Sequence, residues 1–125
     1  MASLPLGTRI AVFVRDRGAC IYCGATYQNG ARLSVDHVQS RKRGGSDMFT
    51  NLVTACLPCN KDKAHFSLKA YLVELEDRGQ LAAGEGTKIV ERVDAARMAK
   101  IDWVAVKRAA AELKRQAEET EDDDD

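Results

Sequence analysis

Four cysteines are the residues whose spacing most directly indicates chemistry. They form two Cys-x-x-Cys pairs, Cys20 with Cys23 and Cys56 with Cys59. A two-residue spacer lets both thiolates face one metal ion, and two such pairs can complete the tetrahedral coordination of Zn²⁺. Four sulfur ligands leave no open position for a substrate, so the predicted zinc ion is structural and any catalysis lies elsewhere.

Two alternative roles for these cysteines fit the sequence less well. Structural disulfides are typical of exported proteins, and residues 1–7 lack the long apolar core of a signal peptide. A thioredoxin-like redox centre uses a single Cys-x-x-Cys in a βαβ setting. The 32 residues between the two pairs exceed the roughly 15–20 of a simple zinc module, which predicts an insert between them.

That insert carries a spaced series of polar residues. The series runs Asp36-His37, Gly44-Gly45, Asn51-Leu52-Val53 and Cys56-x-x-Cys59-Asn60-x-x-Lys63, with Val14-Arg15-Asp16-x-x-x-Cys20-x-Tyr22-Cys23-Gly24 upstream. Together these elements resemble the motif of the HNH endonucleases, over about residues 9–66. The resemblance is specific because several elements agree in spacing, whereas a lone Asp-His pair would indicate almost nothing.

The resemblance implies a role for each polar residue: His37 as general base, Asp36 and Asn60 as ligands of a divalent ion, and Asn51 as the orienting central asparagine. DNA hydrolysis suits these residue types, because histidine titrates near neutrality and can take a proton from water. A metal ion would neutralise phosphate charge and stabilise the leaving oxygen. Asn60 stands where the family often has histidine, and two oxygen ligands favour Mg²⁺ or Mn²⁺ over Zn²⁺.

Each of these residues also has an ordinary structural explanation when it is taken alone. Asp36 suits a turn, Asn51 a turn or cap, and Asn60 a helix cap. His37 alone would be a half-buried imidazole. The joint spacing favours the site. His65, the only other histidine, matches no ligand position and is expected to be structural or exposed.

Charge is segregated along the chain. Lys and Arg number 19, as do Asp and Glu, giving a net charge of zero. Residues 1–70 nevertheless carry ten basic against four acidic side chains, a net of +6, whereas residues 71–125 carry nine against fifteen, a net of −6. A basic first half favours an anionic partner, here DNA.

The basic residues nearest the motif are predicted to bind DNA phosphates without choosing a sequence. They are Arg41, Lys42 and Arg43 in a polar loop, and Lys61 and Lys63 on the following helix. The alternative is a solvated basic loop.

Turn and cap signals divide the chain into short elements. Thr8 is predicted to cap a helix over 8–17, and strands are expected at 33–35 and 51–54 around the polar loop. A helix should begin near Cys59. Ser67 should cap another helix that ends at Gly79, and a loop at 80–87 precedes helices at 88–99 and 103–116, the last capped by Asp102.

These elements predict an α+β fold with a small ββα-metal core, stapled by the four-cysteine zinc site and followed by additional C-terminal helices. Residues 1–79 would form the HNH nuclease domain with its zinc knuckles, and residues 80–117 a helical C-terminal extension that packs on the core or mediates self-association. Residues 118–125 are expected to be a disordered acidic tail that maintains solubility or competes with DNA.

The predicted function is metal-dependent hydrolysis of DNA phosphodiester bonds by a one-metal mechanism, with nicking or double-strand cleavage. The alternative is a non-catalytic zinc module that binds nucleic acid or protein. The chain would act as a monomer or homodimer, or within a larger phage or mobile-element complex. The sequence lacks an apolar run of roughly 18–20 residues, so we expect a cytoplasmic protein without a membrane partner.

Overall fold

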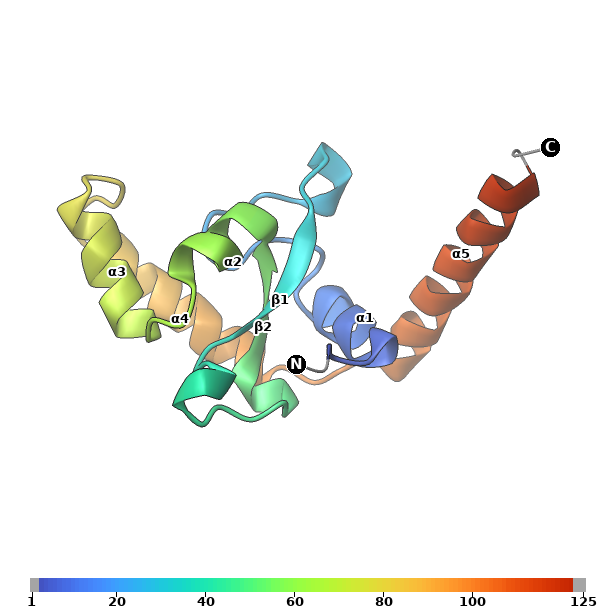
Figure 1. Ribbon diagram of the computed structural model, residues 1–125, viewed down its shortest axis with the longest axis horizontal. Helices are drawn as coiled ribbons and strands as arrows, with labels where there is room; N and C mark the ends of the chain where they lie inside the picture. Colours follow the sequence, from blue (N-terminus) through green and yellow to red (C-terminus); the bar gives the residue numbers. More distant parts are fainter. Residues whose placement is uncertain (1–2, 123–125) are drawn as a thin grey trace.

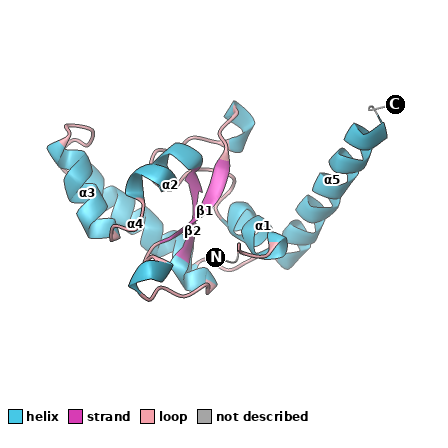
Figure 2. Cartoon of the chain, viewed as in Figure 1, coloured by secondary structure: helices cyan, strands magenta, loops and turns pink. Residues whose placement is uncertain are grey.

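The computed structural model describes residues 3–122 as helices arranged around a small antiparallel hairpin (Figures 1 and 2). The strands are β1 (Leu33–His37) and β2 (Leu52–Cys56). The helices are α1 (Leu6–Arg15), α2 (Leu57–Lys63), α3 (Leu68–Asp77), α4 (Glu85–Met98) and α5 (Trp103–Asp122). The predicted α+β class is confirmed. Within the described residues, none of these helices is long and apolar enough to cross a membrane.

The hairpin register decides which side chains share a face. His37 pairs with Leu52, Asp36 with Val53, and Val35 with Thr54. Because successive strand residues point to opposite faces, Asp36 and Val53 lie on one face, and His37 and Leu52 on the other.

Each face of the hairpin is covered by different helices. On the His37 face, Leu52 packs with Leu4 and with Val12 of α1. On the Asp36 face, Val53 and Ala55 join a buried cluster with side chains from the cysteine knuckles and from α3 and α4, namely Cys20, Tyr22, Val38, Cys56, Tyr71, Leu72, Leu75, Ile89 and Val93. Helix α4 therefore contributes to the same core as the hairpin.

A buried ion pair joins the end of α1 to β2. Arg15 Nε lies 2.8 Å from Asp16 Oδ1, and the two side chains are 1% and 2% exposed. Arg15 also donates to the carbonyls of Phe49 (2.9 Å) and Leu52 (2.5 Å). Asp16 Oδ2 accepts the Thr54 backbone N–H at 2.7 Å. Both charged side chains therefore also form hydrogen bonds with backbone groups at the hairpin.

Three helices begin earlier than the sequence signals indicate, and one of them, α4, begins at Glu85, inside the loop predicted at 80–87. Helix α1 begins at Leu6 after Pro5, so the predicted cap at Thr8 is wrong; the buried Leu4 already fixes the chain at this point. Helix α2 begins at Leu57 because Pro58 suits a first helical turn, where its missing N–H has no helical partner to lose.

The cap signals of the later helices are confirmed. Ser67 Oγ accepts the Ala70 N–H at the start of α3, and Asp102 Oδ1 accepts the N–H groups of Val104 and Ala105 at the start of α5. Gly79, which was expected to end α3, has a φ of 72°. This is the left-handed conformation that glycine commonly adopts just after a helix.

Helix α5 extends away from the hairpin (Figure 1). Near its start, Val106 packs against Ile10 and Ala11 of α1. The sequence predicts disorder from Glu118, but the helix continues through Asp122. The remaining residues of the predicted tail, 123–125, lie outside the described part of the chain.

The Arg15–Asp16 pair generates a stability prediction. Replacing Asp16→Ala should lower the free energy of unfolding by about 3–5 kcal/mol, because it leaves a buried guanidinium uncompensated. Urea denaturation would measure this loss. Asp77→Ala, at an exposed position on α3, is the matched control and should change stability by less than about 0.5 kcal/mol. Equal stability of the two variants would contradict the structural role of Asp16.

Candidate functional site

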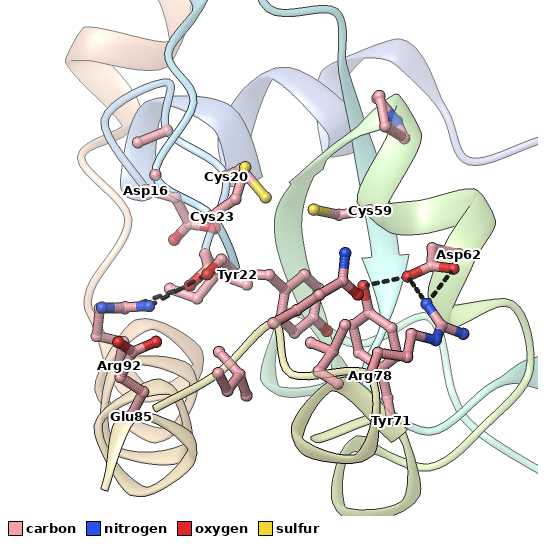
Figure 3. Close-up of a pocket in the computed structure, with 17 residues that line it drawn as sticks. Asp16, Cys20, Tyr22, Cys23, Cys59, Asp62, Tyr71, Arg78, Glu85 and Arg92 are labelled. Carbon is pink, nitrogen blue, oxygen red and sulfur yellow. Dashed lines mark hydrogen bonds and ion pairs between the residues drawn. The ribbon is translucent and has the colours of Figure 1, made fainter. Parts of the chain in front are cut away.

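The four cysteines converge as the sequence predicts. Their Sγ atoms all lie within 4.8 Å of one another. Cys20 and Cys23 occupy a tight turn after α1, whereas Cys56 ends β2 and Cys59 lies in the first turn of α2. Figure 3 shows Cys20 and Cys59 with their sulfur atoms facing one another. The hairpin therefore brings the two distant pairs into one cluster.

The geometry of this cluster suits a metal ion and not a disulfide. Cys23 Sγ and Cys56 Sγ are 3.7 Å apart, far beyond the S–S bond of about 2.05 Å. A tetrahedron with metal–sulfur bonds of about 2.3 Å has sulfur–sulfur edges of about 3.8 Å. A hydrogen bond from the Cys59 thiol lowers the pKa of Cys20 to about 4. The four cysteines can therefore hold a metal ion such as zinc.

Asp36 is buried and held from two sides. Its side chain is 3% exposed, and Tyr22 from the first cysteine knuckle donates its hydroxyl to Asp36 Oδ2 at 2.5 Å. Lys63 Nζ lies 3.3 Å from the same carboxylate and donates to the His37 carbonyl at 3.1 Å. Burial raises the pKa of Asp36, while the Lys63 charge opposes that rise.

The position of Lys63 corrects the predicted contact between this residue and DNA. Its side chain is fully buried, at 0% exposure. Lys63 follows Asn60 by three residues, so both lie on the face of α2 that packs against β1. Its ammonium group therefore compensates Asp36 inside the protein, out of reach of an external phosphate.

Asn60 also faces β1. Its Nδ2 donates to Ser34 Oγ at 2.8 Å and to the Val35 carbonyl at 3.4 Å. Asn60 is therefore a link between α2 and β1, and its amide oxygen is the atom that could coordinate a cation. A carboxylate and an amide oxygen suit Mg²⁺ or Mn²⁺. Such an ion at Asp36 would compete with the Lys63 ammonium for the carboxylate.

Asn51 closes the loop between the strands. Its Oδ1 accepts the Gln39 N–H at 2.9 Å, and its Nδ2 donates to the carbonyls of Gln39 (2.9 Å) and Ser46 (2.7 Å). Gly45 must be glycine here, since a Cβ at this position would lie 1.7 Å from the Gln39 carbonyl oxygen. Asn51 thus fixes the shape of the loop that follows His37.

That loop brings the carboxylate of Asp47 within hydrogen-bond distance of His37. Asp47 Oδ1 lies 2.7 Å from His37 Nε2, and Arg41 donates to Asp47 from Nε at 2.9 Å and from Nη2 at 3.0 Å. The hydrogen bond from Arg41 and that from His37 lower the pKa of Asp47 to about 2. An ionised acceptor favours the Nε2–H tautomer of His37, which leaves Nδ1 with a lone pair.

The sequence-predicted residues are therefore arranged in two groups around the end of β1. Asp36 faces α2, the helix that carries Asn60, whereas His37 lies on the opposite strand face with Asp47 and Arg41. The remaining basic candidates, Lys42, Arg43 and Lys61, are exposed. His65 is also exposed and stacks on Phe66, with ring centroids 5.5 Å apart.

Sequence reasoning missed two residues of this site. Tyr22 lies between the paired cysteines and resembles a spacer residue, and Asp47 closes a polar loop that suggests flexibility. The only sequence signal for Asp47 is its place after Gly44-Gly45-Ser46, since no local pattern relates it to His37 ten residues earlier. Both contacts depend on the folded loop and knuckle.

Another cavity, beside the first cysteine knuckle, lies away from His37. It has a volume of about 990 Å³ and is lined by the first cysteine knuckle, α3 and the start of α4 (Figure 3). Tyr71 donates to Asp62 at 3.1 Å, and Arg78 Nη1 donates to Asp62 at 2.8 Å. Arg92 donates to the Ile21 carbonyl at 3.2 Å. These contacts support the cysteine knuckle and α2.

Comparison with known proteins supports the resemblance. Residues 20–66 match the family model described as HNH endonuclease. This segment, which includes both cysteine pairs and the whole β1–β2 hairpin, is therefore similar to the HNH endonucleases. No curated protein matches the chain.

A solved structure of the Type II-C Cas9 enzyme from Actinomyces naeslundii is similar over 81% of this chain, with 21% identity and a TM-score of 0.37. The present chain spans 12% of the length of that chain. This TM-score does not establish a common overall fold, so the similarity to HNH endonucleases rests on residues 20–66.

The different burial of two lysines on α2 can be tested directly. Lys63→Ala should lower the free energy of unfolding by about 3–5 kcal/mol, because it leaves the Asp36 carboxylate buried without its partner. Lys61→Ala removes the same charge from an exposed position and should cost less than about 0.5 kcal/mol. Urea denaturation of both variants provides the comparison. If Lys63→Ala unfolds at the wild-type urea concentration, the buried pair does not stabilise the fold.

Proposed function

We propose that this protein is a metal-dependent endonuclease that hydrolyses DNA phosphodiester bonds by HNH chemistry. The observation that carries this proposal is the His37–Asp47 hydrogen bond of 2.7 Å at the end of β1, inside the segment that matches the HNH family. An oriented imidazole beside a basic surface is what hydrolysis of a phosphodiester near neutral pH requires.

His37 is the general base of this proposal. Its Nδ1 accepts a proton from a water molecule as the water oxygen bonds to phosphorus and the bond from phosphorus to the 3′ oxygen breaks, and the departing 3′ oxygen takes a proton from a solvent water molecule. The products are a 5′ phosphate and a 3′ hydroxyl. Asp47 holds the imidazole ring and favours the tautomer that this step needs. Asn51 acts through the loop, because its hydrogen bonds to Gln39 and Ser46 fix the segment that carries Asp47.

Asp36 and Asn60 are the residues that would hold a divalent ion, Mg²⁺ or Mn²⁺. When bound, the ion supplies positive charge to the phosphate and to the leaving oxygen. Tyr22 and Lys63 orient the Asp36 carboxylate. Ser34 and the Val35 carbonyl orient Asn60 through its amide nitrogen, so its amide oxygen remains the available ligand atom.

The four cysteines are proposed to bind one structural Zn²⁺. The site is closed, because all four positions of a tetrahedron are taken by sulfur. Tyr22 lies between two of these cysteines and contacts Asp36, so a metal ion in the cluster would stabilise the knuckle that positions the carboxylate.

The DNA-contacting surface of this proposal consists of Arg41, Lys42, Arg43 and Lys61. Three of them are exposed, and Arg41 is half-buried against Asp47. A monomer with a single site would nick one strand; cleavage of both strands would need a second copy or a second encounter. We propose the boundaries 1–79 for the nuclease unit and 80–117 for the helical extension.

A non-catalytic zinc module that binds nucleic acid is the second candidate. One observation favours it: Asp36 is buried and already paired with Lys63, which is an arrangement suited to a structural carboxylate. An assay on supercoiled plasmid with Mg²⁺ or Mn²⁺, and with EDTA as control, separates the two functions. Binding of DNA without cleavage under either ion would support the module.

His37→Ala should lower the rate of plasmid cleavage by roughly 10²–10⁴-fold, because general-base catalysis contributes about that factor. DNA affinity, metal content and melting temperature should stay near wild-type values, since His37 belongs neither to the cysteine cluster nor to the exposed basic residues. His65→Ala changes the other histidine and is the matched control, with cleavage expected to remain at the wild-type rate. Wild-type cleavage by His37→Ala would eliminate this general base.

The purified, reduced protein should contain one zinc ion per chain. Cys56→Ser should lose the ion and unfold or lose much of its stability, because a structural zinc site contributes directly to the free energy of folding. Elemental analysis and circular dichroism would measure the two effects. Freshly prepared protein that is folded and free of zinc would refute the four-cysteine site.

A further inference from the structure

A small pocket lies along the free edge of β1, next to His37. Its volume is about 330 Å³, within the range of ligand-binding pockets. Its walls come from the segment before α1, from α1, from β1 and from the following loop, and are formed by Ser3, Leu4, Arg9, Phe13, Leu33, Ser34, Val35, His37 and Arg41.

The charge of this pocket has one sign. Its charged side chains are Arg9 and Arg41, beside the titratable His37, and no Asp or Glu is among the described residues that line it. The cavity beside the first cysteine knuckle differs, because acidic and basic side chains both line it. Of the two, the pocket beside His37 is the one whose charge would attract an anion.

Arg9 is the arginine of this pocket whose guanidinium is available to bind a ligand. It lies on α1 one turn before Phe13, so both side chains face the same direction. Arg9 is exposed, and among residues 3–122 its guanidinium has no hydrogen-bond or ion-pair partner. Arg15, at the end of the same helix, is committed to Asp16 and to the hairpin carbonyls. Arg41 is held by Asp47.

The pocket also adjoins Asn60. Ser34, which lines the pocket, accepts the hydrogen bond from Asn60 Nδ2 at 2.8 Å. An anion in the pocket would thus lie close to His37 on one side and to the residue that contacts Asn60 on the other. Ser34 therefore connects the pocket beside His37 to Asn60 on α2.

We propose that this pocket receives the phosphodiester group of the DNA and that Arg9 binds its oxygens, with Arg41 as the second, pre-positioned guanidinium. The identity of the anion as a DNA phosphate rests on the proposed function. A guanidinium group suits this role because its forked N–H groups match two phosphate oxygens.

DNA binding without cleavage provides the test. Affinity for a short DNA duplex is measured in EDTA across a series of salt concentrations, with the wild type, Arg9→Ala, Arg9→Lys and the control Arg108→Ala. Arg108 is an exposed arginine on α5 that does not line the pocket. Losing one phosphate contact should reduce the slope of log K against log salt by about 0.9. Arg9→Ala should show this reduction, whereas Arg9→Lys and Arg108→Ala should retain the wild-type slope.

A second measurement uses dimethyl phosphate as a minimal probe. Added to the wild type, it should shift the imidazole NMR signals of His37, and Arg9→Ala should abolish this shift while keeping the wild-type melting temperature. A wild-type salt slope for Arg9→Ala, or a His37 shift that persists in it, would overturn the proposal. Arg9-dependent binding without any cleavage would overturn the nuclease function alone, and absence of DNA binding by the wild type would overturn both.

Discussion

The buried carboxylate of Asp36 is the group on which the arrangement of the site depends. A carboxylate at 3% exposure is costly unless its oxygens are paired, and here the partners come from two separate elements. Tyr22 reaches it from the first cysteine knuckle and Lys63 reaches it from α2. Both partners lie within four residues of cysteines that belong to the cluster. The cysteine cluster, α2 and β1 are therefore connected through one carboxylate, and a disturbance in any of them would be felt at the end of β1.

The alternation of side chains along β1 is the second constraint. Asp36 and His37 are adjacent, yet they face opposite sides of a two-stranded sheet, so no single helix can position both. The Asp36 side is organised by α2, while the His37 side depends on the loop that Asn51 closes. A two-stranded sheet leaves β1 with a free edge, and the basic pocket lies there. The proposed phosphate-binding site uses this edge because His37, Arg9 and Arg41 line the pocket there.

Charge in this molecule has distinct uses according to burial. Arg15 and Lys63 are basic residues of the first half, and both form buried ion pairs with carboxylates and hydrogen bonds with carbonyl groups. Arg9, Lys42, Arg43 and Lys61 remain exposed. The net charge of the first half therefore overstates the basic surface that DNA would meet, and the distribution of exposed cations around β1 is the more relevant quantity.

The sequence by itself determined the cysteine cluster, the hairpin between the two pairs and the HNH resemblance, because cysteine spacing, strand propensity and motif spacing can all be recognised along the chain. It also indicated the caps at Ser67 and Asp102. The partners of the site residues were decided only by the tertiary structure. The sequence alone predicted that Lys63 contacts DNA, whereas in the structure α2 directs it toward Asp36. The sequence also gave no indication that Asp47 contacts His37, because this contact depends on the loop that Asn51 closes. The C-terminal end of α5 was also decided by the structure. The acidic composition predicted disorder from Glu118, but the helix continues through Asp122, because an acidic segment can continue a helix that has already been nucleated. Contacts between residues that are distant in sequence, such as Lys63 with Asp36, depend on how helices and loops pack in the folded protein. Residue spacing along the chain does not specify that packing directly.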